Sequence, residues 1–139
     1  MVSVNVIKRG LYKGITTTWL LAKVVVPVYL AVTFLSFTPL LNKLATLCAP
    51  LMKYLGLPGE ASLAIVLGNA VNLYAALGAM ASLPLTSREV TIIAMMLLLS
   101  HTIFVESAVA GKCGINPWVV GGCRFVFSVT VGVFLNQVL

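Results

Sequence analysis

The chain has very few charged side chains, and none of them is an aspartate. Charged residues make up 9% of its 139 residues, whereas soluble domains carry roughly 25%. Such a sequence has too little polar side chain to cover a surface that faces water. A soluble globular domain is therefore excluded. The hydrophobic content of 60% and the mean hydropathy of +1.10 predict an integral membrane protein instead.

The few charges that are present are mostly positive. Nine Lys or Arg residues stand against three Glu residues, which gives a formal net charge of +6. Basic chains often bind nucleic acid, but these basic residues are scattered singly and no polar domain presents them. We therefore exclude nucleic acid as a partner. Membrane lipids are the expected partner, with the positive charge near anionic headgroups.

The sequence also lacks the motifs of a metal site or a catalytic nucleophile. Its three cysteines, Cys48, Cys113 and Cys123, have no Cys-x-x-Cys or His-linked spacing, and there is one histidine. One His with one Glu is too small a ligand set for a metal site, and no nucleophile triad is present. We therefore predict a protein that is not an enzyme, has no metal or cofactor, and uses its cysteines as apolar packing residues.

Five apolar stretches predict an all-α integral membrane fold, with residues 1–139 forming a single membrane domain. Residues 1–22 mix Lys, Thr and Trp with aliphatic residues, which predicts an amphipathic segment at the membrane interface. The plasma membrane of a prokaryote, an inner-membrane setting, is the expected location. Four stretches are long enough to span a membrane, and they cover residues 24–41, 60–83, 90–110 and 117–139.

One apolar stretch, Leu44–Leu55, is too short to cross the membrane. A helix of this length reaches about 18 Å, whereas the hydrocarbon core is roughly 30 Å thick. The stretch also contains Pro50 and Lys53, and it ends at the turn signal Gly56–Gly59, which reads Gly-Leu-Pro-Gly. We expect a half-helix that is either re-entrant or interfacial.

Small residues form a stripe on the predicted helix over residues 60–83. At ~100° per residue they fall within about a quarter of the circumference. A helix-packing seam is one interpretation, because small residues let helix backbones approach closely in lipid. A site for a polar solute or an ion is the other, because Asn69 and Asn72 lie at mid-membrane depth. The stripe consists of Ala61, Ala64, Gly68, Asn72, Ala75, Ala79 and Ser82.

The predicted helix over residues 90–110 has His101 and Glu106 inside its apolar run, flanked by Ser100 and Ser107. Ionisable side chains at this depth are costly and by default point to function. A regular helix would place His101 and Glu106 roughly 140° apart, so they converge only if the helix breaks or bulges between them.

Two structural pairings also remain open for Glu106. Glu106 can form a structural pair with Arg124 of the last span or with Lys112. Glu60 follows the Gly-Leu-Pro-Gly turn and opens a helix, where the helix dipole stabilises a carboxylate. The candidate substrate-binding or coupling residues are therefore His101, Glu106, Asn72, Asn69, Ser100 and Ser107, with Glu60 and Arg124 as further candidates.

Four sequence runs carry a resemblance to a known family: LGLPGEA (Leu55–Ala61), GNAVNLY (Gly68–Tyr74), SREVTI (Ser87–Ile92) and SHTIFVES (Ser100–Ser107). Together they make residues 44–114 resemble the nucleoside recognition, or Gate, domain family. Gate domains are similar to parts of concentrative nucleoside transporters and ferrous-iron permeases, and they also occur as short chains such as spore maturation proteins. The resemblance implies a nucleoside-like solute and ranks His101 and Glu106 first among the candidate site residues.

We therefore expect a small transporter or permease module for a small polar solute, with Na⁺ or H⁺ as a coupling ion. The alternative is a membrane scaffold or regulatory subunit that transports nothing. Transport requires a polar cavity, whereas a scaffold would bury its polar side chains in direct pairs. Broken or re-entrant helices leave backbone groups that protein must cover, and this short chain has little protein for that purpose. A homodimer, or a pair with a related half-size chain, is expected.

Overall fold

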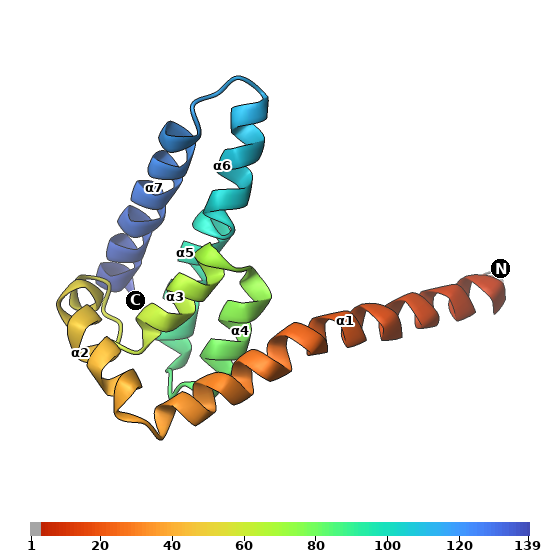
Figure 1. The fold of residues 1–139 in the computed structure, drawn as a ribbon, viewed down its shortest axis with the longest axis horizontal. Helices are drawn as coiled ribbons and strands as arrows, with labels where there is room; N and C mark the ends of the chain where they lie inside the picture. Colours follow the sequence, from red (N-terminus) through yellow and green to blue (C-terminus); the bar gives the residue numbers. More distant parts are fainter. Residues whose placement is uncertain (1–3) are drawn as a thin grey trace.

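The computed structural model describes residues 4–139, and this part of the chain is helical without a strand. The prediction of an all-α membrane protein is confirmed. Three helical segments have the length and composition to cross a membrane: Val4–Ser36, Ser87–Lys112 and Pro117–Val138. Residues 1–3 of the predicted interfacial segment lie outside the described residues. The helices are α1 (Val4–Ser36), α2 (Pro39–Tyr54), α3 (Ala61–Ala70), α4 (Leu73–Ser82), α5 (Ser87–Ser100), α6 (Ile103–Lys112) and α7 (Pro117–Val138) (Figure 1).

Helix α1 is continuous for 33 residues, although the sequence suggested an interfacial segment followed by a separate span over residues 24–41. It ends at Ser36 because Pro39 forces a new start. A proline restricts the residue before it to extended backbone, and Thr38 has φ −106° and ψ 153°. Pro39 then occupies the first turn of α2, where its missing N–H costs nothing. The predicted end of this helix at Leu41 was therefore wrong.

Helix α2 ends at the turn that the sequence predicted. Gly56 adopts φ +64°, which glycine tolerates without a steric penalty. Its N–H donates to the carbonyl of Lys53, and the N–H of Leu57 donates to the carbonyl of Met52. This pair of bonds is the Schellman termination. With 16 residues, α2 reaches about 24 Å, which is longer than predicted but still shorter than the hydrocarbon core.

The stretch over residues 60–83 is not one spanning helix, and that prediction was wrong. It divides into α3 and α4, which fold back on each other as a hairpin (Figure 1). A Cβ placed on Gly68 would lie 3.1 Å from the Cβ of Ala76. Eight residues of continuous helix would separate these positions by about 12 Å. The small-residue stripe serves this close approach, since Ala61, Ala64 and Ala79 are fully buried.

Helices α5 and α6 follow each other along one path, and α7 packs against both (Figure 1). The predicted capping box opens α5: the Thr86 hydroxyl accepts from the N–H of Glu89, and the Glu89 carboxylate accepts from the N–H of Thr86. Ile92, Ile93 and Leu97 on α5 are completely buried and form the centre of the core. Helix α5 therefore positions both the hairpin and α7.

Hydrogen bonds of Arg88 and Asn136 join the first turn of α5 to the C-terminal ends of α2 and α7. The Arg88 guanidinium donates to the main-chain carbonyl of Asn136 at 2.8 Å and to its side-chain oxygen at 2.6 Å. It also donates to the carbonyl of Gly56 at 3.3 Å. The Asn136 amide donates to the carbonyl of Tyr54 at 3.1 Å. Arg88 thus satisfies carbonyls at the ends of α2 and α7, where no helical donor is available.

Candidate functional site

The path from α5 to α6 breaks at His101 and Thr102, in the middle of the polar run. Thr102 adopts φ +50°, and within residues 4–139 it is the only residue other than glycine with positive φ. A β-branched residue in this region is strained and persists only where its surroundings hold it. Here the N–H of Thr102 donates to the carbonyl of Gly68 at 3.1 Å. The hairpin therefore holds the break in place.

The break brings His101 and Glu106 together. The sequence analysis expected this only if the helix broke or bulged between the two residues. His101 Nδ1 lies 3.9 Å from Glu106 Oε1. The Thr102 hydroxyl lies between them, 3.0 Å from His101 Nδ1 and donating to Glu106 Oε1 at 3.4 Å. A regular helix would have separated the imidazole from the carboxylate. The left-handed residue at the break therefore converts two separated side chains into one polar row.

Arg124 of α7 completes this row. Its guanidinium forms an ion pair with Glu106 Oε2, and its Nε donates to the carbonyl of Leu99 at 2.9 Å. One of the two arrangements left open by the sequence, Glu106 with Arg124, is therefore present. Among the ion pairs of residues 4–139, none includes Lys112. We name the set His101, Thr102, Glu106 and Arg124 the polar row.

The electrostatics of the broken helix account for the positions of the two charges. Helix α5 ends at the break, where its last carbonyls lack helical N–H partners and favour the Arg124 cation beside Leu99. Helix α6 begins there, and its first turn contains Glu106, where the N-terminal dipole favours a carboxylate. The side chains of His101, Glu106 and Arg124 are 31%, 40% and 26% exposed. The row is therefore open on one side.

The hairpin places Asn69 and Asn72 beside its turn, in two different roles. The Asn72 side-chain oxygen caps α4 by accepting from the N–H of Ala75 at 2.9 Å. Asn69 donates its amide to the carbonyl of Ile65 at 2.8 Å, while its side-chain oxygen is buried and has no hydrogen-bond partner among residues 4–139. Asn72 therefore has a structural task, whereas Asn69 retains an unused acceptor.

The two serines that flank the row differ in the same way. The Ser100 hydroxyl is buried and donates to the carbonyl of Met96 at 2.9 Å, which satisfies it locally. The Ser107 hydroxyl is buried and has no partner in the described part of the chain. Glu60 is separated from all of these residues, because it precedes α3 at the end away from the hairpin turn (Figure 1). Its side chain makes no capping bond there.

Asn69 and Ser107 both line a groove of about 610 Å³ between α6 and α7. The rest of its wall is apolar and partly aromatic, with Phe104, Trp118 and Phe125. The members of the polar row are not part of this wall. The structure therefore divides the predicted site residues into four groups. They are three members of the polar row (His101, Glu106 and Arg124), two residues in the groove wall (Asn69 and Ser107), the locally satisfied Asn72 and Ser100, and the separate Glu60.

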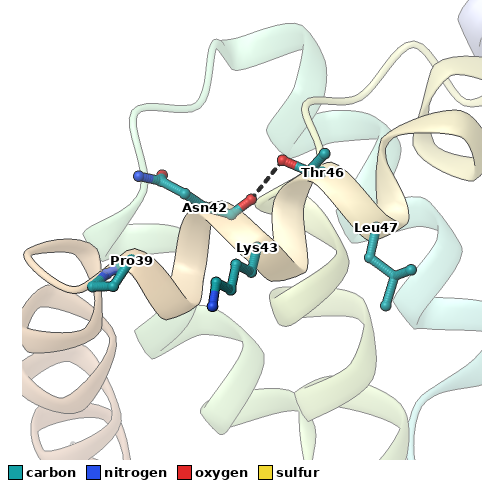
Figure 2. Close-up of a pocket in the computed structure, with 5 residues that line it drawn as sticks. All are labelled: Pro39, Asn42, Lys43, Thr46 and Leu47. Atoms are coloured by element: carbon teal, nitrogen blue, oxygen red, sulfur yellow. Dashed lines mark hydrogen bonds between the residues drawn. The ribbon is translucent and has the colours of Figure 1, made fainter.

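A separate groove runs along α2 and contains none of the predicted site residues. Its wall is formed by Pro39, Asn42, Lys43, Thr46 and Leu47. Figure 2 shows that the Asn42 and Lys43 side chains point to different sides of the helix, and that the Thr46 hydroxyl donates to the main-chain carbonyl of Asn42 at 2.7 Å. Polar groups that do not converge cannot orient one ligand, so this surface is not a candidate site.

Thr102 and the carbonyl of Gly68 are parts of the site that the sequence did not single out. Thr102 stands within the polar triplet Ser-His-Thr, but its side chain gives no sign that its backbone is left-handed. Gly68 was assigned to packing alone.

Within residues 4–139, no group of three potential metal-ligating side chains is present.

The comparisons with known proteins identify the family to which the chain belongs. The sequence profile of the nucleoside recognition (Gate) family matches residues 18–116, which includes the region 44–114 where the resemblance was found. The chain therefore belongs to the Gate family, as the resemblance indicated.

One relative can be named more specifically. The chain is 41% identical over 129 residues to the uncharacterized membrane protein YvoD of Bacillus subtilis (strain 168). The aligned region is 93% of this chain but 41% of that protein, so the chain spans well under half of its relative. No solved structure matches the chain.

Proposed function

We propose that the chain is the gate module of a membrane transporter or permease for a small polar solute, nucleoside-like by its family, in a prokaryotic plasma membrane. One observation carries the proposal: the hairpin α3–α4 meets the break between α5 and α6 at the hydrogen bond from the Thr102 N–H to the Gly68 carbonyl. Discontinuous helices within a membrane commonly form solute and ion sites, because their ends present free backbone groups and dipoles.

The polar row supplies the groups that coupling requires. The imidazole of His101 and the carboxylate of Glu106 are joined through the Thr102 hydroxyl, so a proton has a short route between them. Protonation of Glu106 would weaken its ion pair with Arg124, and hence the contact between α6 and α7. We therefore favour H⁺ over Na⁺ as the coupling ion, with His101 and Glu106 as the coupling residues.

A membrane scaffold or regulatory subunit is the second candidate, and the direct Glu106–Arg124 ion pair favours it. A closed pair needs no ligand to satisfy its charges. Solute uptake separates the two candidates. The purified chain is reconstituted in proteoliposomes and tested with labelled nucleosides, small ions and an imposed pH gradient. Uptake above that of empty liposomes, driven by the gradient, is expected. Folded protein without uptake of any probe would favour the scaffold.

We further predict that the active form is an oligomer, with a homodimer or a pair with a related half-size chain as the partner. The hairpin and α2 are both too short to span, and one chain covers them incompletely. The relative YvoD contains more than twice the aligned length, so a second module has room in that protein. Native mass measurement in mild detergent should show a species of twice the chain mass. A monomer at every concentration, with no co-purified chain, would contradict this expectation.

A further inference from the structure

The first half of α1 packs against no other part of the described chain. Every residue from 4 to 20 is exposed, and burial begins only near Leu21. Helix α1 leaves the helical body at an angle to α5, α6 and α7 rather than alongside them (Figure 1). The second half does pack, because α1 contacts α4 closely around Gly78. The first half therefore meets surroundings that lie outside the chain.

This free half has a basic side and an apolar side. At ~100° per residue the basic residues of this half, together with Lys23 just beyond it, fall within an arc of about 140°. Four of its six Val, Ile and Leu residues fall within about 80° on the other side, whereas Val6 borders the basic arc and Leu20 lies inside it. Trp19 lies at the boundary, with the Lys23 ammonium 5.8 Å from the centroid of its ring. The basic residues are Lys8, Arg9, Lys13 and Lys23, and the aliphatic ones include Val4, Ile7, Leu11 and Ile15.

The basic side has no acidic partner in its neighbourhood. The sequence contains no Asp or Glu before Glu60, and no ion pair within residues 4–139 includes a basic residue of α1. Lys8, Arg9 and Lys13 surround a shallow hollow of about 290 Å³ together with Tyr12. The wall of the hollow is formed by the apolar parts of these side chains. Three positive charges gathered on one side of a helix, with no acidic partner, match anionic phosphate groups in charge.

We infer that the first half of α1 is a lipid-recognition helix, whose basic side binds the phosphate headgroups of anionic phospholipids. The aliphatic side then enters the acyl-chain region, and Trp19 lies at headgroup depth, as aromatic residues do at membrane interfaces. A water-soluble anion would satisfy the charges but would leave the aliphatic side in water. A second copy would place like charges near one another unless it bound through the aliphatic side. The inference is independent of transport.

The test uses the full chain in lipid nanodiscs, with Trp19 as the reporter. A Trp118→Phe background leaves Trp19 as the sole tryptophan, because the chain contains two. A minor fraction of brominated lipid is added, either phosphatidylglycerol or phosphatidylcholine, and quenching of Trp19 is compared. We expect phosphatidylglycerol to be enriched around Trp19 at least about fivefold, the factor for ~1 kcal/mol per basic residue near a membrane surface. High salt should reduce the enrichment.

The decisive variant is the triple substitution Lys8→Gln, Arg9→Gln and Lys13→Gln, which should reduce the enrichment to nearly one. The matched control removes three charges from exposed lysines elsewhere, Lys43, Lys53 and Lys112, and should retain the enrichment. Circular dichroism checks that both triple variants stay folded. Equal quenching by the two lipids, or enrichment that survives the α1 substitutions, would overturn the inference. So would Trp19 quenching by either lipid that increases only when the protein is diluted, because a second copy would then cover this helix.

Discussion

Gly68→Leu should cost the protein about 3 kcal/mol of unfolding free energy or more, at the upper end of what overpacking costs. A Cβ at Gly68 would lie 2.5 Å from Leu97 Cδ2 and 3.1 Å from the Cβ of Ala76. Leu97 is completely buried, so it has no free space into which to move. The larger side chain must push α3 away from α5 and α4, which also weakens the bond from Thr102 N–H to Gly68 O.

The matched control is Gly122→Leu. Gly122 is exposed, and a Cβ at this position meets no heavy atom within 4 Å, so we expect the same substitution to be accommodated. It should leave stability within about 0.5 kcal/mol or raise it slightly, since leucine favours helix more than glycine. Thermal unfolding of both variants in the same detergent provides the comparison. Similar losses for the two variants would show that the hairpin is not packed against α5 as described.

Helix ends were predicted correctly where the signal depends only on residues close by in the sequence. The Gly-Leu-Pro-Gly turn after α2 and the capping box at Thr86 depend on neighbours within a few residues, and the structure contains both. Pro39 carried the same kind of signal, but it lies inside an apolar run and was taken as part of a span. The predicted span over residues 24–41 followed the hydropathy and not the proline. Hydropathy does not distinguish one long helix from two helices that meet at a proline.

The hairpin of α3 and α4 had no comparable signal. The run from Glu60 to Leu83 contains no proline, and its turn falls at Val71 and Asn72. Asn72 is a good N-cap, but in a long apolar stretch it is equally compatible with a mid-membrane amide. What decides the fold is the packing of small residues between the two antiparallel segments, together with the packing of α3 against α5 and of α4 against α1. The contacts with α5 and α1 are between distant parts of the chain, so periodicity could not reveal them.

The polar row was predicted in part, for a physical reason that applies to membranes in general. Ionisable residues in an apolar run are costly, so His101 and Glu106 were conspicuous, and Arg124 was the nearest basic residue in the next span. The convergence of these side chains depends on the left-handed backbone of Thr102, which cannot be recognised from any side chain. The sequence therefore identified the members of the row but not the backbone device that assembles them.

Glu106→Gln should abolish coupled uptake while leaving the protein folded. Glutamine has nearly the same shape, and its amide oxygen can still accept a hydrogen bond from Arg124. Arg124 also keeps its bond to the carbonyl of Leu99. We therefore expect a stability loss of about 1 kcal/mol. Uptake should fall at least about tenfold, because an amide cannot take up or release the proton that the carboxylate exchanges with His101.

Arg124→Met provides the contrast. It leaves the Glu106 carboxylate without its cation beside an apolar span, which costs roughly 3 kcal/mol for a buried pair and less here, because the side chain is 40% exposed. The double variant, Glu106→Gln with Arg124→Met, removes both charges and should recover part of the stability lost by Arg124→Met alone. That recovery measures the coupling between the two side chains.

Melting temperature and uptake, measured for all three variants, separate the transporter from the scaffold. In a transporter, Glu106→Gln and the double variant both remain folded and both lack uptake, so activity does not follow stability. In a scaffold, any functional loss follows the amount of folded protein, and the double variant regains both. His101→Gln belongs beside them, because it removes the other proton acceptor of the row without touching the Arg124 ion pair. A folded Glu106→Gln protein with full uptake would end the coupling role of Glu106.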